Sequence, residues 1–268
     1  MLICGKRQKT YTVQRKNKMK LKGIEFPLYI IKFCEKPEYI DDIMDGRLYM
    51  RASGYFRDLP EENTYRGDPF DGKMPIEIGE EEVYIEGPDG ERVYLNGVPW
   101  ASMQNFTAGF SGDDKIPIFC ACLFTDEMME KTGETSFRIK KDYVEALAQF
   151  GSYVAMIPIG EVLEKLNQYE KLHPDIAFKA EPVRYTDIKK EYMADILNDD
   201  ERDWTEPFFI KDNSYHLQNE WRLIAFSKKD NFLVDSPTGA WICDLGKFEY
   251  AVRMTTEDLV HGEFHVGE

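Results

Sequence analysis

The chain has 268 residues, of which 43% are hydrophobic and 13% aromatic, and its formal net charge is −15. This apolar content is sufficient for a buried core, which excludes a chain that is disordered throughout. No run of 18 apolar residues occurs, so we expect no membrane-spanning segment and no membrane partner.

The charge is distributed unevenly along the chain. Residues 1–24 carry eight Lys and Arg side chains and no acid, so the remaining residues carry −23. We expect residues 1–24 to be a basic, disordered tail, in which Met19 is an alternative start. The acidic body is not expected to bind nucleic acid over a broad surface, because neutralising phosphates requires positive charge.

Cysteine and histidine usage favours a cytoplasmic protein without a metal centre. The five cysteines are odd in number and irregularly spaced, which favours buried free thiols in a reducing compartment. The opening segment Met1–Gly5 is too short for the apolar region of a signal peptide. Four scattered histidines give no cluster of metal ligands, so no metal is expected.

The first part of the chain predicts two strands around a short helix, followed by a polar loop. Residues 26–33 predict a strand, Pro37 opens a helix that Gly46 ends, and residues 48–50 predict a second strand. The loop over 57–73 contains the sequence RGDPFDG at 66–72, whose composition is typical of turns.

Two acids of this loop, Asp68 and Asp71, could bind Mg²⁺ or cap a turn. The turn is the favoured interpretation, because two acids without a third ligand are a weak metal signal. We therefore expect the loop at most to line the rim of a pocket.

The middle and the end of the chain alternate short strands and helices. Residues 82–95 flank a Pro-Asp-Gly turn and predict a hairpin, which we interpret as an insertion near 80–97. The apolar run 116–124 predicts a strand at the centre of a sheet. Further helices are predicted over 140–150 and 160–169, and further strands over 153–159, 221–227 and 248–254. Because regular βαβ alternation is missing, residues 25–268 are predicted to form a single α+β domain with mixed or antiparallel sheets and short flanking helices.

Glu220 and Arg222 stand two residues apart at the start of the apolar run 223–226. In a strand, side chains two residues apart leave the same face, so this acid and this base are expected side by side. They predict either an ion pair within the sheet or part of a site.

Two separated regions together resemble a large bacterial and phage family catalogued only as a domain of unknown function. They are a first strand with Tyr29 and Lys32, followed by the Asp68-Pro69 loop, and a late strand with Glu220-Trp221-Arg222. The same layout is similar to the ADP-ribosyltransferase fold, which has a split sheet. The resemblance therefore implies such a sheet here, with NAD as a substrate.

The resemblance also implies roles for individual residues. Lys32 would contact the nicotinamide ribose, Ser53 or Tyr55 would shape the nicotinamide pocket, and Glu220 would orient the ribose 2′-hydroxyl. Apart from the resemblance, Arg51 and Arg66 could bind a phosphate or form surface ion pairs, and together with Arg222 they are candidates for cofactor binding. The sequence departs from the fold's pattern in two respects: Lys32 replaces a His or Arg, and no Glu-x-Glu or Gln-x-Glu precedes the late strand.

Three functions stay open at this point. The first is an NAD-utilising transferase or glycohydrolase that acts on a protein or nucleic-acid target, in a phage-conflict or toxin–antitoxin setting with an antitoxin or host-protein partner. The second is a non-enzymatic acidic protein that inhibits a host protein by binding to it. The third is a module that binds NAD or ADP-ribose without turnover.

Overall fold

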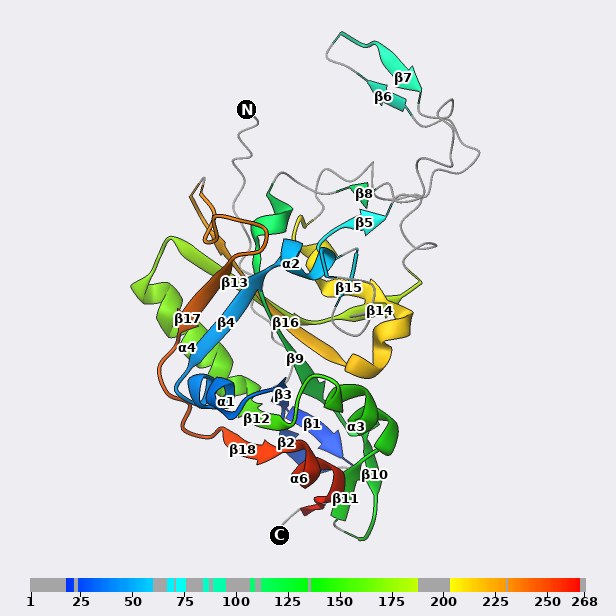
Figure 1. The fold of residues 1–268 in the computed structure, drawn as a ribbon, viewed down its shortest axis with the longest axis vertical. Helices are drawn as coiled ribbons and strands as arrows, with labels where there is room; N and C mark the ends of the chain where they lie inside the picture. The colour runs from blue at the N-terminus through cyan, green and yellow to red at the C-terminus, as the bar shows by residue number, and fades with distance from the viewer. Residues whose placement is uncertain are drawn as a thin grey trace.

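The computed structural model describes residues 18–21, 24–59, 67–69, 71–75, 84–86, 89–94, 107–108, 112–134, 136–187, 203–229 and 231–265. These residues form a mixed α+β fold whose strand pairs are mostly antiparallel, as the sequence predicts (Figure 1). No helix among them is both long and apolar enough to cross a membrane.

The centre of the fold is an eight-stranded sheet. Six strands run in the order β13-β16-β9-β3-β12-β18, and β4 and β17 join this path at β9. In chain order the strands are β3 (Tyr29–Cys34), β4 (Arg47–Ala52), β9 (Pro117–Phe124), β12 (Tyr153–Pro158), β13 (Ile176–Pro182), β16 (Glu220–Ser227), β17 (Ala240–Asp244) and β18 (Val252–Thr255).

The sheet divides at β9. One edge of this strand pairs with β16. The other edge is shared, because Ile31 of β3 pairs with Cys122 near one end and Arg51 of β4 pairs with Ile118 near the other. The described strand pairs leave residues 119–121 unpaired on this edge, so β3 and β4 diverge from β9 in two directions (Figure 1).

The apolar composition of β9 explains its central place. Seven of its eight residues are buried, and only Cys120 is partly exposed. A strand that is covered on both faces is expected to be apolar throughout, and the prediction from the run 116–124 is therefore confirmed.

Helices cover the sheet on both faces. The helices α1 (Pro37–Met44) and α4 (Ile159–Leu172) contribute to one hydrophobic cluster, and α3 (Lys141–Ala148) and α6 (Thr256–His261) contribute to a second one. The short helix α2 (Ser53–Arg57) follows β4 directly.

The predicted start and end of α1 are confirmed. Pro37 occupies the first helical position, where a missing N–H costs nothing. Gly46 follows the helix with φ +85°, and a Cβ there would lie 2.0 Å from the carbonyl oxygen of Gly246. Glycine is therefore required both by the left-handed backbone and by the close approach of a second segment.

The remaining strands form small sheets around this core. The predicted hairpin is present, since β6 and β7 pair antiparallel from Tyr84–Tyr94 to Glu86–Arg92. The other short elements are β1 (Lys18–Leu21), β2 (Ile24–Pro27), β5 (Met74–Pro75), β6 (Tyr84–Glu86), β7 (Arg92–Tyr94), β8 (Thr107–Ala108), β10 (Met129–Lys131), β11 (Ser136–Ile139), β14 (Arg184–Thr186), β15 (Ile210–Asp212), β19 (Phe264–His265) and the 3₁₀ helices η4 (Asp113–Lys115), η5 (Asp126–Met128), η6 (Glu206–Phe209) and η7 (Asn213–Gln218).

The segment expected to be a tail differs from that expectation at its end. Lys18–Leu21 is a strand that pairs antiparallel with Ile24–Pro27, so the chain has backbone partners before residue 25. Residues 1–17 lie outside the described residues.

Candidate functional site

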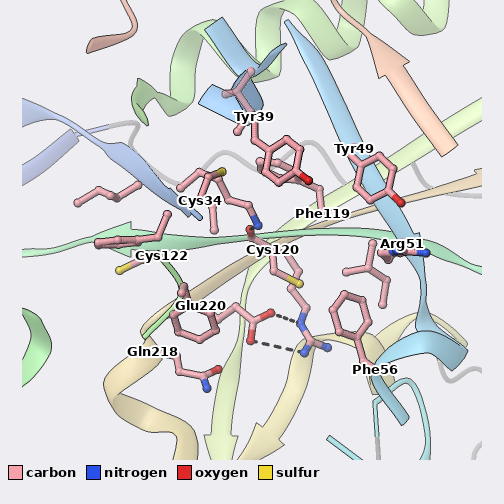
Figure 2. Close-up of a pocket in the computed structure, with 18 of the residues that line it drawn as sticks. Cys34, Tyr39, Tyr49, Arg51, Phe56, Phe119, Cys120, Cys122, Gln218 and Glu220 are labelled. Carbon is pink, nitrogen blue, oxygen red and sulfur yellow. Dashed lines mark hydrogen bonds and ion pairs between the residues drawn. The ribbon is translucent and has the colours of Figure 1, made fainter. Parts of the chain in front are cut away.

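A pocket of about 660 Å³ lies where the sheet divides (Figure 2). Its walls come from β3, β4, β9, β15, β16, α1 and the segment around Asp71. Five residues that the sequence singled out for a site line it, namely Lys32, Arg51, Tyr55, Glu220 and Arg222. The division of the sheet thus brings the two ends of the domain to one cavity.

Lys32 and Glu220 reach this pocket from opposite faces of the sheet. Cys122 pairs with both Ile31 and Glu220, so these three side chains share one face, and Lys32, which follows Ile31, leaves the other. Figure 2 shows Phe119 and Glu220 on opposite sides of β9. The gap between β3 and β4 is what opens both faces to the same cavity.

Lys32 is anchored at the unpaired edge of β9. Its Nζ donates a hydrogen bond to the backbone carbonyl of Cys120 at 2.6 Å and lies 5.0 Å from the centroid of the Phe119 ring. Within the described residues this is its one hydrogen bond, so two of its three N–H donors can face a ligand.

Glu220 and Arg222 form the same-face ion pair that their spacing predicts. The Nε atom of Arg222 donates to Glu220 Oε1 at 2.6 Å, and Nη2 lies 3.5 Å from Oε2. Arg222 also binds Asp71 with two parallel hydrogen bonds of 3.0 Å each and the carbonyl of Phe208 at 2.8 Å. All five N–H donors of this guanidinium are therefore used by the protein.

This result changes the roles expected for two residues. Arg222 is only 1% exposed and has no donor left for a ligand, so it orients Glu220 instead of binding a cofactor directly. Asp71 is 2% exposed and holds Arg222, so it does more than line the rim of the pocket. The predicted turn is present, since the Asp71 N–H donates to the carbonyl of Asp68 at 3.0 Å, and the Asp71 side chain has this second role in addition.

Lys211 and Gln218 complete the floor beneath Glu220. The Nζ atom of Lys211 donates to Gln218 Oε1 at 2.9 Å and to Glu220 Oε2 at 3.2 Å. Tyr185 contacts the backbone of Glu220, since the Tyr185 hydroxyl accepts a hydrogen bond from the Glu220 N–H at 2.8 Å. Glu220 is thus held on both carboxylate oxygens and on its backbone.

The pKa values of the two carboxylates that bind Arg222 are shifted in opposite directions. Burial disfavours the charge of Glu220, but Arg222 and Lys211 outweigh it, so the pKa of Glu220 lies well below its ordinary value. Burial raises the pKa of Asp71 to about 6, because Arg222 only partly offsets it and the neighbouring Asp68 adds a like charge. Glu220 therefore stays anionic and is a poor proton acceptor.

The Glu220 carboxylate retains room for one ligand donor. It offers about four acceptor positions, of which Arg222 and Lys211 occupy three. The thiol of Cys120 lies on the same face of the sheet, because Cys120 pairs with Arg222. Because a thiol is a weak donor, a hydroxyl from a ligand can take the remaining position.

Aromatic rings and an arginine form the outer part of the pocket. The Arg51 guanidinium lies 4.3 Å from the Tyr55 ring centroid and 5.3 Å from that of Tyr49, and its Nη1 donates to the Thr238 carbonyl at 2.9 Å. Tyr39 and Tyr49 are about half exposed and both line the pocket (Figure 2). Among the described residues Arg51 uses one of its five donors in this way, and a stacked arginine with further donors suits an oxyanion such as a phosphate.

Two expected site residues are not placed in the pocket. Ser53 is fully buried outside it, with its hydroxyl donating to the carbonyl of Asp113 and its N–H bound to the carbonyl of Ile116. Ser53 therefore joins the end of β4 to η4 and does not face a ligand. Arg66 lies outside the described residues.

The sequence did not reveal the roles of Lys211 and Asp71 in the site. Lys211 follows the apolar residues 208–210 and looks like any strand lysine. The turn-like composition around Asp71 indicates only a local role for this residue, in capping the turn. Charged residues next to apolar runs could have indicated both roles. A charge that is buried at such a position requires a partner of opposite charge elsewhere in the chain.

The pocket also contains thiols. All four described cysteines are free, and Cys34, Cys120 and Cys122 line the cavity. Burial raises the pKa of Cys120 and of Cys122 far above the ordinary value, with Glu220 adding to the effect. Both thiols are therefore protonated at neutral pH and are weak nucleophiles. Among the described residues, no three metal-ligating side chains gather into one group.

Comparisons with known proteins add no name to this geometry. No protein-family model matches the chain, and neither a curated protein nor a solved structure matches it.

Proposed function

We propose that the chain is an NAD-utilising protein of the ADP-ribosyltransferase type, which cleaves the glycosidic bond of NAD and transfers ADP-ribose to a macromolecule or to water. The observation that carries this proposal is the pocket at the division of the sheet, where Lys32 and Glu220 meet although 188 positions separate them in the sequence.

The size and lining of the pocket suit a dinucleotide. Its volume of about 660 Å³ lies within the range of roughly 300–1,000 Å³ that is usual for ligand pockets. Arg51 supplies donors for the pyrophosphate and Lys32 supplies donors for the nicotinamide ribose, and the rings of Tyr39, Tyr49 and Tyr55 supply surfaces on which a base or nicotinamide can stack.

Glu220 has the properties that glycosidic cleavage requires of a carboxylate. The C1′–N bond breaks with its electrons on nicotinamide, which leaves as a neutral molecule, and positive charge develops on the ribose. A fixed carboxylate that accepts a hydrogen bond from the 2′-hydroxyl of the ribose stabilises this charge. Since Arg222 and Lys211 keep Glu220 anionic, it acts as a hydrogen-bond acceptor and stabilises the positive charge. The hydroxyl of water or of the target molecule forms the new bond to C1′, and its proton goes to solvent.

A second function has its own support in the site. Glu220 shares its charge with two cations in hydrogen-bond contact, which weakens its field at the ribose. This observation favours a module that binds NAD or ADP-ribose without turnover. An acidic protein that acts by binding a host protein remains the alternative that needs no pocket.

One experiment separates these possibilities. Nicotinamide release from NAD is measured for the purified protein and for Glu220→Gln, with Glu145→Gln as a matched control because Glu145 is an exposed glutamate on α3. Thermal stabilisation by NAD and by ADP-ribose is recorded in parallel, and circular dichroism verifies the fold of each variant.

Each outcome decides the question. Release that is lost in Glu220→Gln and kept in Glu145→Gln supports the enzyme. Stabilisation without release supports the binding module. Neither release nor stabilisation at millimolar nucleotide would overturn both and leave the non-enzymatic alternative.

A further inference from the structure

Lys211 is a buried charge of the pocket that acts on Glu220 together with Arg222, and its separate contribution can be derived from its contacts. It is 3% exposed, and its short strand β15 pairs in parallel with β14. Its ammonium group is surrounded by Gln218 Oε1 at 2.9 Å, Glu220 Oε2 at 3.2 Å and the Tyr215 ring, whose centroid lies 4.5 Å away. The protein thus satisfies this cation on three sides.

Stability alone does not explain a charge in this place. Taking an ammonium group out of water is costly, and an apolar side chain of similar volume would fill the same space at no such cost. The group is tolerated because four charges in direct contact, those of Asp71, Glu220, Lys211 and Arg222, sum to zero. What the cation adds must therefore be sought in its effect on its neighbours.

The hydrogen bonds show where that effect falls. Arg222 donates to both Asp71 and Glu220, whereas Glu220 is the one carboxylate in the described part of the chain to which Lys211 donates a hydrogen bond. Glu220 therefore has two cations at hydrogen-bond distance and Asp71 has one. This difference accounts for the lowered pKa of Glu220 and contributes, with burial, to the raised pKa of Asp71.

We propose that Lys211 is a positioning residue for Glu220: it holds Oε2 from the floor of the pocket and keeps the carboxylate anionic and in one orientation, so that it can accept a hydroxyl from the ligand. The proposal rests on the proposed function insofar as Glu220 is taken to be the residue that meets the ligand. The titratable and polar groups that face Glu220 from the surrounding elements are Lys211, Gln218, Arg222, Asp71, Cys120, Cys122 and the hydroxyl of Tyr185.

Lys211→Met tests this role, with Lys179→Met as the matched control. Lys179 is also a largely buried lysine that contacts an acid, Asp203 at 2.8 Å, and a ring, Phe209 at 5.0 Å, but it does not line the pocket. Lys211→Gln keeps a neutral donor at the same place and serves if the Met variant does not fold.

The first readout needs no ligand. In protein labelled with ¹³C only at glutamate carboxyl groups, the Glu220 signal is assigned by its loss in Glu220→Gln and followed from pH 4 to pH 8. We expect no titration of this signal above pH 4 in the parent protein or in Lys179→Met, and in the Lys211 variants a titration whose midpoint lies above pH 4. A Glu220 signal that is unchanged in the Lys211 variants would refute the proposal.

The second readout is nicotinamide release. If the parent releases nicotinamide, Lys211→Met should lower kcat at least tenfold with little change in KM, because the interaction matters most in the transition state. Lys179→Met should change kcat less than twofold, and equal losses in both variants would reduce Lys211 to a purely structural residue. If the parent shows no release, the proposed function fails while the carboxyl titration still decides the role of Lys211.

Discussion

Replacement of Arg222 by methionine should be among the most damaging single substitutions in this protein. The Arg222 side chain is 1% exposed, and it is the shared partner of two buried carboxylates, Asp71 and Glu220. Methionine fills much of the same volume, so the loss reflects mainly the charge and the five hydrogen bonds.

The expected magnitude follows from the burial of the partners. Removal of one member of a buried ion pair costs about 3–5 kcal/mol, because the remaining charge has no compensation. Lys211 still compensates Glu220 in the variant, so Asp71 carries most of the loss. Arg222→Met should therefore lower the free energy of unfolding by about 3–5 kcal/mol at pH 7.5.

A double-mutant cycle isolates this interaction. Asp71→Asn replaces this buried carboxylate by a neutral amide. Arg222→Met should therefore lower the free energy of unfolding less in the Asp71→Asn background than in the parent protein. The coupling energy between the two positions should be about 1–3 kcal/mol. Unfolding in urea is followed by tryptophan fluorescence, for which Trp221 lies beside the cluster.

An exposed arginine provides the control. Arg47 also contacts two carboxylates, Asp42 and Asp45, but its side chain is 42% exposed, so Arg47→Met should cost far less than Arg222→Met. Equal losses in the two arginine variants, or strictly additive effects in the cycle, would show that the buried cluster is not coupled as described.

Two further predictions concern Asp71 and Ser53. The pKa of Asp71 is raised from an ordinary 3.8 to about 6, so its favourable contribution is complete well below pH 3.8 and is lost as the pH rises through 6. Relative to Asp71→Asn, the free energy of unfolding of the parent should fall by about 3 kcal/mol between pH 3 and pH 7.5, and parallel pH–stability curves would contradict this. Ser53→Ala removes the buried hydrogen bond to the Asp113 carbonyl and should cost about 1–3 kcal/mol in urea unfolding, without changing the thermal shift produced by NAD; a loss of that shift at preserved stability would return Ser53 to the pocket.

Local features of the fold were predictable because local rules determine them. The end of α1 at Gly46 follows from its left-handed backbone, and the central place of β9 follows from its unbroken apolar run. The shared face of Glu220 and Arg222 follows from the two-residue period of a strand. Each of these inferences needs only a few neighbouring residues.

The site was predictable only in part for the same reason. Lys32, Arg51, Tyr55 and Glu220 do line one pocket. Ser53 does not, because the chain turns into α2 directly after β4 and buries this hydroxyl against η4. The position of Ser53 relative to the pocket depends on where a strand ends, which sequence patterns place least reliably.

The strand faces, the helix boundary and the central strand could be read from short segments, since side-chain period and backbone conformation are encoded in consecutive residues. The pairing of Asp71 with Arg222, 151 positions further along the chain, and the contact of Lys211 with Glu220 depend on the tertiary structure. The tertiary structure also decided that Lys32 and Glu220, on opposite faces of the sheet, share a cavity, because β3 and β4 divide the edge of β9 between them. Contacts of this kind arise from the order in which strands pair, and pairing joins residues whose separation leaves no periodic trace in the sequence.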